Sequence, residues 1–160
     1  MLGKNEIYEI VEKIAKAENL SIDKKAIEAL YEISEGDCRK TINLLQASAS
    51  LSKHINDETI YEVTARAKPQ DISEVLNLAL NKDFLSARNR MHEMMLKQGL
   101  AGLDVVKEIQ KEIWNLKISD NAKLILTEKC GEIEFRLTEG ADEFVQLEAL
   151  LAAFSNAKNL

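Results

Sequence analysis

Two cationic side chains stand together in the segment Gly36-Asp37-Cys38-Arg39-Lys40. Glycine ends helices and aspartate caps them, so Asp37 is expected to begin a helix with Arg39 and Lys40 in its first turn. Cations in that turn oppose the helix dipole at a cost of about 0.3–1 kcal/mol each when exposed, and Asp37 offsets part of it. Two cations beside free backbone N–H groups form an anion site, for which phosphate is the obvious ligand. An ordinary solvated helix start is the alternative interpretation.

The other side chains able to bind metals or act as nucleophiles form no recognisable site. His54 and His92 stand far apart and lack the HxxxH or HExxH spacing of a metal site, so we expect both to be structural. Cys38 and Cys130 belong to no CxxC motif or Cys/His cluster. Their placement argues against a zinc site or a disulfide framework and favours a reducing compartment. We therefore expect no metal site in this chain.

The sequence also lacks the motifs by which nucleotide-dependent enzymes hold phosphates. It contains no GxxxxGK[ST] loop, no glycine-rich dinucleotide turn and no apolar run that ends in paired acids. Phosphoryl transfer requires a metal-held triphosphate and a positioned water, and one arginine can only stabilise charge that other groups present. The chain by itself is therefore expected not to be an enzyme.

Composition indicates an ordered helical protein. Of the 160 residues, 46% are hydrophobic, 5% are aromatic and one is proline, which suits helices better than strands or a disordered tail. The net charge of −6 includes no basic tail, so autonomous binding to a DNA backbone has little electrostatic support. No secretory signal pattern is present, and no apolar run approaches the ~18 residues of a membrane span. We expect a soluble, cytoplasmic protein without a membrane partner.

The elements that position Arg39 are expected to be helices, because apolar residues recur at helical spacing nearly everywhere. We count about nine helices, no convincing strand and no internal repeat. Four helices precede the only proline, with Ser21, Asp37 and Asn56 as expected caps. The inward-facing stripes of these four helices are Ile7, Ile10, Val11 and Ile14; Ala26, Leu30 and Ile33; Ile42, Leu45 and Ala49; and Ile60, Val63 and Thr64.

The single proline, Pro69, marks the predicted boundary between two domains, because proline disfavours helix in the residue before it. About five helices follow it. In one of them, Met91, Met94 and Met95 continue a helical stripe that begins at Phe84. Core packing is therefore a better interpretation of these methionines than an adaptable binding groove.

The last predicted helix carries more apolar residues than one small bundle is expected to bury. Leu147, Leu150, Leu151 and Phe154 form a broad stripe along it. We therefore predict that residues 68–160 self-associate or join similar domains of other chains.

The segment around Arg39 resembles the sensor 2 motif of AAA+ clamp loaders, written GDxR with an asparagine four residues after the arginine. In this chain the motif consists of Gly36, Asp37, Arg39 and Asn43. Residues 26–49 are similar to the lid helices of replication factor C small subunits, particularly the archaeal ones. Residues 133–153 are similar to the final collar helices of the same subunits. The resemblance extends over nearly the whole chain, from about residue 7 to residue 154.

This resemblance implies an all-α fold with a four-helix AAA+ lid at residues 1–67 and a collar of about five helices at residues 68–160. In the family, the arginine that matches Arg39 reaches the phosphates of ATP bound to the same subunit. The collars assemble large and small subunits into a ring of five, which opens a sliding clamp and places it on primer–template DNA. Nucleotide binding by Arg39 and all of these partners are expectations that follow from the resemblance.

The sequence departs from the family because it lacks the ATPase domain. The phosphate loop, the acid pair, the trans-acting arginine and the main clamp-contacting surface all belong to that domain. We therefore expect the chain to be a truncated or separately encoded half of such a subunit. ATP and magnesium are expected to be cofactors of a full-length subunit and not of this chain.

Two other functions fit parts of the sequence. The lid and oligomerisation region of a different AAA+ protein, such as a repair ATPase, would have the same two domains, and the residues encoded upstream would distinguish it. A helix-turn-helix DNA-binding regulator would use the helix from Cys38 to Leu51 for recognition. That helix offers few side chains for both groove reading and phosphate contacts, namely Arg39, Lys40, Asn43 and Gln46, with Lys53 nearby.

Overall fold

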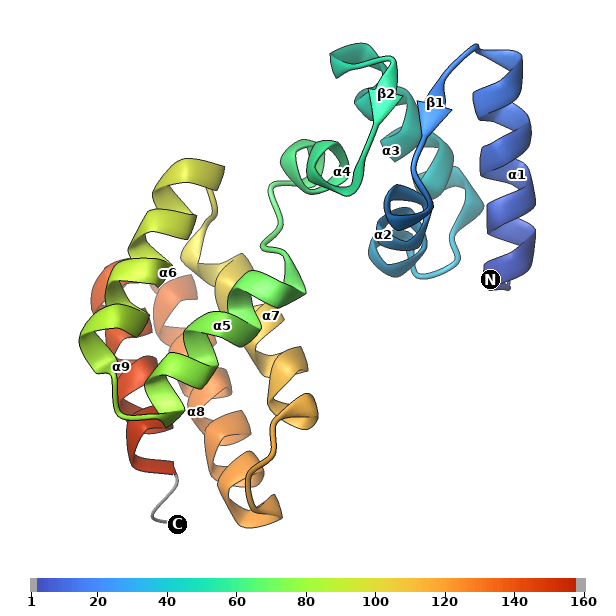
Figure 1. Ribbon diagram of the computed structural model, residues 1–160. Coiled ribbons are helices and arrows are strands. Elements are labelled where there is room, and N and C mark those ends of the chain that lie inside the picture. Colours follow the sequence, from blue (N-terminus) through green and yellow to red (C-terminus); the bar gives the residue numbers. More distant parts are fainter. Residues whose placement is uncertain (1–2, 158–160) are drawn as a thin grey trace. The chain divides into compact units, whose positions relative to one another are not determined.

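The computed structural model describes residues 3–157, which form nine α-helices, one 3₁₀ helix and two very short strands (Figure 1). The predicted all-α fold class is confirmed. Packing divides the chain into two compact units, residues 1–65 (unit 1) and residues 66–160 (unit 2), and each unit has its own hydrophobic core. None of the helices in the described part of the chain has the length and apolar character needed to span a lipid bilayer.

Unit 1 is a bundle of four helices whose apolar stripes meet in one core. Ile7, Val11, Leu30, Leu45 and Ile60 lie at its centre, each at most 1% exposed. The elements of unit 1 are α1 (Lys4–Ala17), β1 (Ser21–Ile22), α2 (Lys24–Ser34), α3 (Cys38–Leu51), β2 (His54–Ile55) and α4 (Asp57–Thr64).

The prediction that the chain has no strand is wrong. β1 pairs with β2 in parallel, with Ser21 opposite His54 and Ile22 opposite Ile55, and the N–H of Ser21 donates to the carbonyl of Lys53 at 2.9 Å. Each strand has only two residues, too few for the alternation of apolar and polar positions that identifies a strand. The pair also joins segments far apart in the sequence, so no local signal marks it.

The helix starts of unit 1 follow local capping chemistry in two of the three predicted cases. Asp37 and Asn56 each accept a hydrogen bond from the backbone N–H three residues later, at 3.1 and 2.9 Å, as predicted. The prediction that Ser21 caps a helix is wrong, because Ser21 lies in β1 and Asp23 occupies the N-cap position of α2. The strand pairing takes up the residues that would otherwise have begun the helix.

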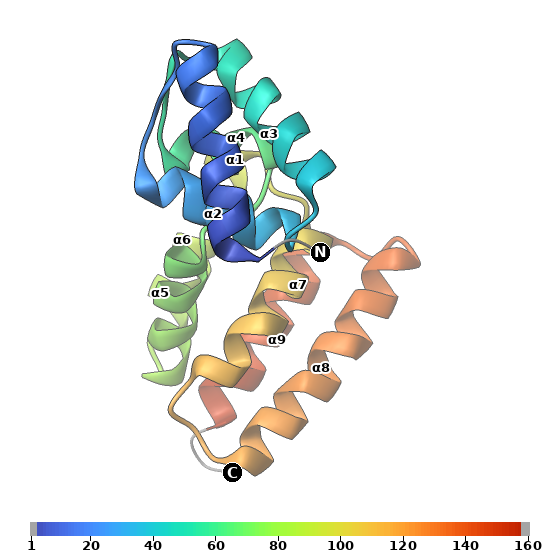
Figure 2. The ribbon, with the colours of Figure 1, turned by 90° about the vertical axis from the view of Figure 1, so that its right-hand side faces the viewer.

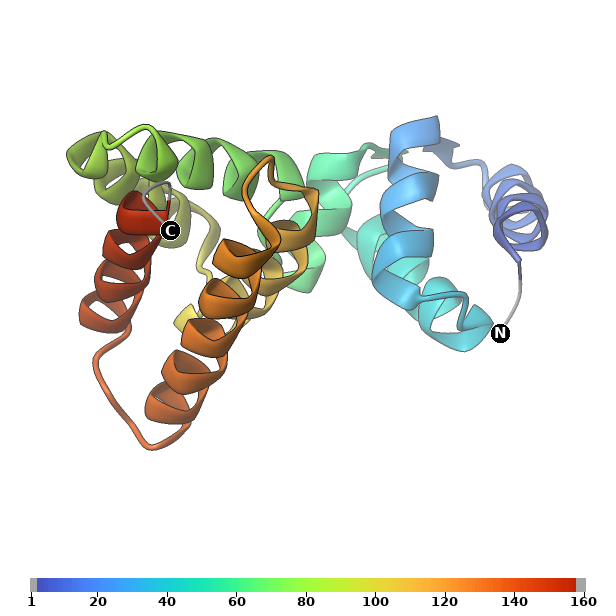
Figure 3. The ribbon, with the colours of Figure 1, turned by 90° about the horizontal axis from the view of Figure 1, so that it is seen from below.

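Unit 2 is a bundle of five helices. It opens at Pro69, the first residue of α5, where the missing N–H removes no bond within the helix, and Lys68 before it is extended. The helices α7 and α8 pack along each other (Figure 2), and α8 and α9 form a hairpin (Figure 3). The elements of unit 2 are α5 (Pro69–Leu80), α6 (Phe84–Gln98), α7 (Gly102–Glu112), the 3₁₀ helix η1 (Ile113–Asn115), α8 (Asp120–Thr138) and α9 (Glu143–Ala157).

The broad apolar stripe of the last helix is fully covered inside unit 2. Leu147, Leu150, Leu151 and Phe154 are all 0% exposed, because α9 packs against the other four helices of the bundle. The expectation that one bundle would leave this stripe uncovered is therefore wrong, and self-association needs a different surface.

The three methionines of α6 line the same core. Met91, Met94 and Met95 are at most 3% exposed, which confirms that they are core residues. Ala67, at 2% exposure, also packs into this core. The predicted domains, residues 1–67 and 68–160, include terminal residues outside the described range 3–157, and the roles of lid and collar stay predictions.

Candidate phosphate-sensing and assembly sites

The turn between α2 and α3 determines where Arg39 stands. Glu35 and Gly36 both adopt left-handed backbone conformations, with φ of 55° and 78°. Glycine suits such a conformation, whereas it strains most other residues. The N–H of Glu35 closes α2 on the carbonyl of Tyr31 at 2.9 Å, and the N–H of Asp37 donates to the carbonyl of Ser34 at 3.0 Å. The chain therefore enters α3 only four residues after it leaves α2.

A buried hydroxyl pair holds the two helices together at this turn. Thr41 and Ser34 are 0% and 2% exposed, and their hydroxyl oxygens lie 2.9 Å apart. The Thr41 hydroxyl also lies 2.8 Å from the backbone carbonyl oxygen of Asp37, which can accept a hydrogen bond from it. The pair links the last turn of α2 to the first turn of α3, so the start of α3 is held by buried contacts.

Arg39 projects from this supported helix start into solvent. The first turn of α3 contains no acidic residue. Within residues 3–157, the exposed side chains of Arg39 and Lys40 make no hydrogen bond or ion pair. An arginine beside the free N–H groups of a helix start can bind a phosphate oxygen through charge-assisted hydrogen bonds. The structure thus places Arg39 and Lys40 together, as the sequence predicts, and leaves both cations accessible to an anion.

His54 links the two short strands of unit 1. Its Nδ1 lies 3.2 Å from the Ser21 hydroxyl, and its Nε2 lies 3.7 Å from the carboxylate of Asp23. The second distance is too long for a hydrogen bond, and the side chains of His54 and Asp23 are more than half exposed. The group has the residue types of a catalytic triad without the aligned contacts that would activate the serine.

His92 joins α6 to α9 in unit 2. Its ring meets the ring of Phe144 edge to face at 4.5 Å, and its Nε2 lies 3.0 Å from the Glu148 carboxylate. Those atoms are within ion-pair distance, but their alignment is too poor for a hydrogen bond. Arg88 donates to the same Glu148 oxygen at 2.8 Å. The contacts of His92 are those of a packing residue, and no group of three His, Cys, Asp or Glu side chains in the described part of the chain could hold a metal.

Unit 2 exposes large apolar side chains that sequence reasoning missed. Leu85 and Leu96 on α6 are 70% and 74% exposed, and Leu124 and Phe135 on α8 are 61% and 66% exposed. We call the first pair the α6 ridge and the second pair the α8 ridge. All four residues lie outside the buried stripe of their own helices, and that position in the helical period was the signal available in the sequence. Val145 on α9 and Trp114 on η1 are also exposed.

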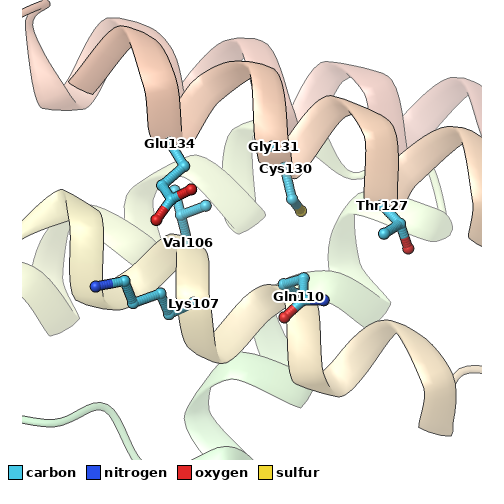
Figure 4. Close-up of a pocket in the computed structure, with 7 residues that line it drawn as sticks. All are labelled: Val106, Lys107, Gln110, Thr127, Cys130, Gly131 and Glu134. Carbon is cyan, nitrogen blue, oxygen red and sulfur yellow. The ribbon is translucent and has the colours of Figure 1, made fainter. Parts of the chain in front are cut away.

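A groove of about 320 Å³ lies between α7 and α8, beside the α8 ridge. Figure 4 shows Lys107 and Glu134 at one end of it, Gln110 and Thr127 at the other, and the Cys130 side chain between the helices. Burial raises the pKa of the Cys130 thiol to about 12, so the group stays protonated and is a poor nucleophile. The groove therefore has polar side chains along its walls but contains no reactive group.

Comparison with solved structures defines the class of fold. The chain resembles the DNA clamp loader delta protein of Bacillus subtilis, with a TM-score of 0.56 over 97% of this chain and 57% of that one. The two are 17% identical, so this likeness concerns the fold alone. The helical arrangement is thus of the kind found in clamp-loader proteins.

Comparison of sequences identifies the family. Residues 67–153 match the replication factor C C-terminal domain. The chain is 46% identical over 154 residues to the replication factor C small subunit of Pyrococcus furiosus, covering 96% of this chain and 18% of that relative. It is 40% identical over 153 residues to the small subunit of Methanocella arvoryzae, covering 96% of this chain and 48% of that relative. The chain belongs to the replication factor C family and spans less than half the length of these relatives.

Proposed function

We propose that the chain acts in a sliding-clamp loader during DNA replication, with unit 2 as the collar that joins subunits and unit 1 as the lid that presents Arg39 to ATP. Its partners would be large and small clamp-loader subunits, and the assembled loader would act on a sliding clamp and primer–template DNA. ATP and magnesium would be bound by a full-length subunit. The observation that carries the proposal is the match of residues 67–153 to the replication factor C C-terminal domain.

The surroundings of Arg39 support the nucleotide-sensing part of the proposal. A guanidinium in the first turn of α3, with no ion-pair partner in residues 3–157, opposes the helix dipole and gains nothing in return within this chain. The phosphates of a nucleotide would supply the missing negative charge. The buried Ser34–Thr41 pair would hold the helix start in place while Arg39 makes that contact.

An assembly experiment tests the collar role. The chain, immobilised through its N-terminus, is expected to retain purified large or small subunits of the clamp loader from its own source. Arg39→Ala should leave this retention unchanged, because residue 39 lies in unit 1, and should weaken ATP-dependent clamp loading when placed in a complete subunit. Failure of every loader subunit to bind the chain would contradict the proposal.

Nucleotide titration tests whether this chain can bind ATP without the ATPase domain of a full-length subunit. We predict that the isolated chain neither hydrolyses ATP nor binds it at micromolar concentration, because a single arginine–phosphate contact cannot offset the cost of association. Isothermal titration calorimetry with Mg·ATP is the measurement, and an ATPase-bearing loader subunit serves as the positive control. A clear micromolar isotherm for the chain alone would contradict the prediction.

The alternative of a DNA-binding regulator has less support. Adjacent basic residues in unit 1 occur only as the two pairs Lys24-Lys25 and Arg39-Lys40, and the chain is acidic overall. A salt-dependent mobility shift of duplex DNA by the isolated chain would favour that alternative over a lid.

A further inference from the structure

The first turn of α3 is fixed by hydrogen bonds that converge on Asp37. The Asp37 side chain accepts from the N–H of Lys40 at 3.1 Å, and its backbone carbonyl accepts from the N–H of Thr41 at 2.9 Å. The Thr41 hydroxyl reaches the same carbonyl at 2.8 Å. These bonds join Asp37 to the residues that follow Arg39, so the backbone position of Arg39 depends on them.

The Thr41 hydroxyl also connects this turn to α2. A hydroxyl has one proton to donate and accepts through two lone pairs. With the Thr41 proton on its shorter contact, to the Asp37 carbonyl, the Thr41 oxygen accepts from the Ser34 hydroxyl at 2.9 Å. Ser34 is the last residue of α2, and Asp37 is the N-cap of α3. An unbroken chain of hydrogen bonds therefore runs from the end of one helix to the start of the next.

The stability of the core does not by itself explain why both of these buried residues are polar. Ser34 and Thr41 are 2% and 0% exposed. Replacing two hydrogen-bonded groups by apolar groups of the same shape can be nearly neutral, so alanine and valine would also fill the two positions. Hydrogen bonds add direction, which apolar contacts lack, and a satisfied buried pair specifies one arrangement of the elements it joins.

The turn between α2 and α3 needs such a constraint. Glu35 has a φ of 55°, a left-handed conformation that is unfavourable for a residue with a side chain. Conformations of this kind persist where the surrounding structure over-determines them, and they are frequent in ligand clamps and switch regions. The bond between Ser34 and Thr41 spans this turn, so it holds the turn in the conformation that presents Arg39.

We propose that Ser34 and Thr41 are positioning residues for Arg39 and thereby raise the affinity of the lid for the phosphates of ATP. The proposal rests on the proposed function, in which Arg39 contacts a nucleotide. Both hydroxyls are buried, so they act through Arg39 and not by touching the ligand. A helix start that is already ordered loses less conformational freedom when Arg39 binds phosphate.

The first measurement is a double-mutant cycle in a complete loader subunit that contains this chain, with Mg·ATP as the ligand. Thr41→Val removes the hydroxyl and keeps the shape of the side chain, and it should weaken ATP binding at least about threefold. In an Arg39→Ala background the same substitution should not change the Kd further, because a positioning residue acts only through the residue that it holds. Thr41→Ser keeps the hydroxyl and should bind ATP within about twofold of the unmodified subunit.

Ser48→Ala is the matched control. Ser48 is also 0% exposed, and its hydroxyl donates to the carbonyl of Leu44 at 2.8 Å, so the substitution removes another buried hydroxyl from α3. Ser48 lies about two turns further along the helix than Thr41. The Kd for ATP should therefore stay unchanged in this variant, whatever the change in the free energy of unfolding.

The second measurement needs no nucleotide. In the isolated chain, Thr41→Val and Ser34→Ala should each speed the hydrogen exchange of the Lys40 amide and lower the ¹⁵N order parameter of Arg39, relative to the other helices of unit 1. Ser48→Ala should leave both quantities unchanged. Ser34→Ala takes the place of Thr41→Val in the cycle if the valine variant does not fold, since it removes the other end of the same bond.

The outcomes distinguish failure of this inference from failure of the proposed function. An unchanged Kd for ATP after Arg39→Ala alone would refute nucleotide sensing by Arg39, and the positioning role with it. If Arg39→Ala weakens binding, the proposed function stands, and any of three results then overturns only the inference. These results are normal ATP binding by Thr41→Val, additive effects of the two substitutions, and unchanged order of Arg39 in the isolated chain.

Discussion

Arg39 and Arg90 show how differently two arginines of one chain are placed. Arg90 donates to the carboxylates of Asp71 and Glu74 at 2.9 and 3.0 Å, and hydrogen bonding to Glu74 raises the pKa of its guanidinium. It thereby ties α6 to α5. Arg39 has no such partner in the described residues. At this scale, an arginine that holds the fold can be distinguished from one that is free for a ligand.

Arg39→Ala should leave the free energy of unfolding of the isolated chain unchanged or raise it by about 0.3 kcal/mol. The substitution removes a cation that opposes the dipole of α3, and alanine is a better helix former than arginine. Arg90→Ala is the matched control and should lower the free energy of unfolding by about 1 kcal/mol, since it leaves two acids without their partner. Urea denaturation curves measure both. A loss above ~1 kcal/mol for Arg39→Ala would assign Arg39 a structural role.

Two glycines of unit 2 differ in what surrounds them, although both belong to helices. Gly102 begins α7, and its N–H donates to the Glu143 carboxylate of α9 at 2.6 Å. A Cβ added at Gly102 would stand 2.9 Å from the Cβ of Glu143, whereas Gly131 in the interior of α8 has open space around it. The close approach of α7 to α9 therefore requires the first glycine, and the packing of unit 2 does not require the second.

Gly131→Ala should raise the free energy of unfolding by about 0.5–1 kcal/mol, because alanine lowers the entropy lost when the helix forms. Gly102→Ala should lower it by about 1–3 kcal/mol, because the backbone of α7 or α9 must shift to admit the methyl group. Thermal and urea unfolding of the two variants at low protein concentration provide the comparison. Equal effects of the same sign would contradict the distinction.

The chain as a whole contains two hydrophobic cores that share no residue. One core is formed by residues of unit 1, and the other, centred on α9, is formed by residues of unit 2. Cooperative unfolding follows shared packing, so separate cores allow the two units to open as separate cooperative units. Unfolding curves of the whole chain should therefore be interpreted as the sum of two transitions.

Phe154→Ala should destabilise unit 2 by about 3–5 kcal/mol, because it opens a cavity at a fully buried site where α9 meets its neighbours. Amides of α5 to α9 should lose protection in hydrogen-exchange mass spectrometry, while those of α1 to α4 should keep theirs. Leu30→Ala, fully buried in unit 1, is the reciprocal control and should reverse the pattern. Parallel loss of protection in both units would show that the chain unfolds as one unit.

Much of this protein was determined by its sequence alone, namely the features that depend on neighbouring residues. Asp37 and Asn56 cap helices because the bond that each makes reaches only three residues along the chain. Arg39 was found at a helix start for the same reason. Local pattern also identified Met91, Met94 and Met95 as core residues, since one helical period relates them.

Tertiary structure decided the features that depend on distant residues. Helical spacing shows which side of α9 is apolar but not how many helices surround it, so a stripe interpreted as a contact surface proved to be the centre of the bundle. The same limit hid the ridges on α6 and α8, because exposure is decided by the elements that pack nearby. The pairing of Ser21 with His54 depends on two segments meeting in space, and no pattern within either segment records that contact.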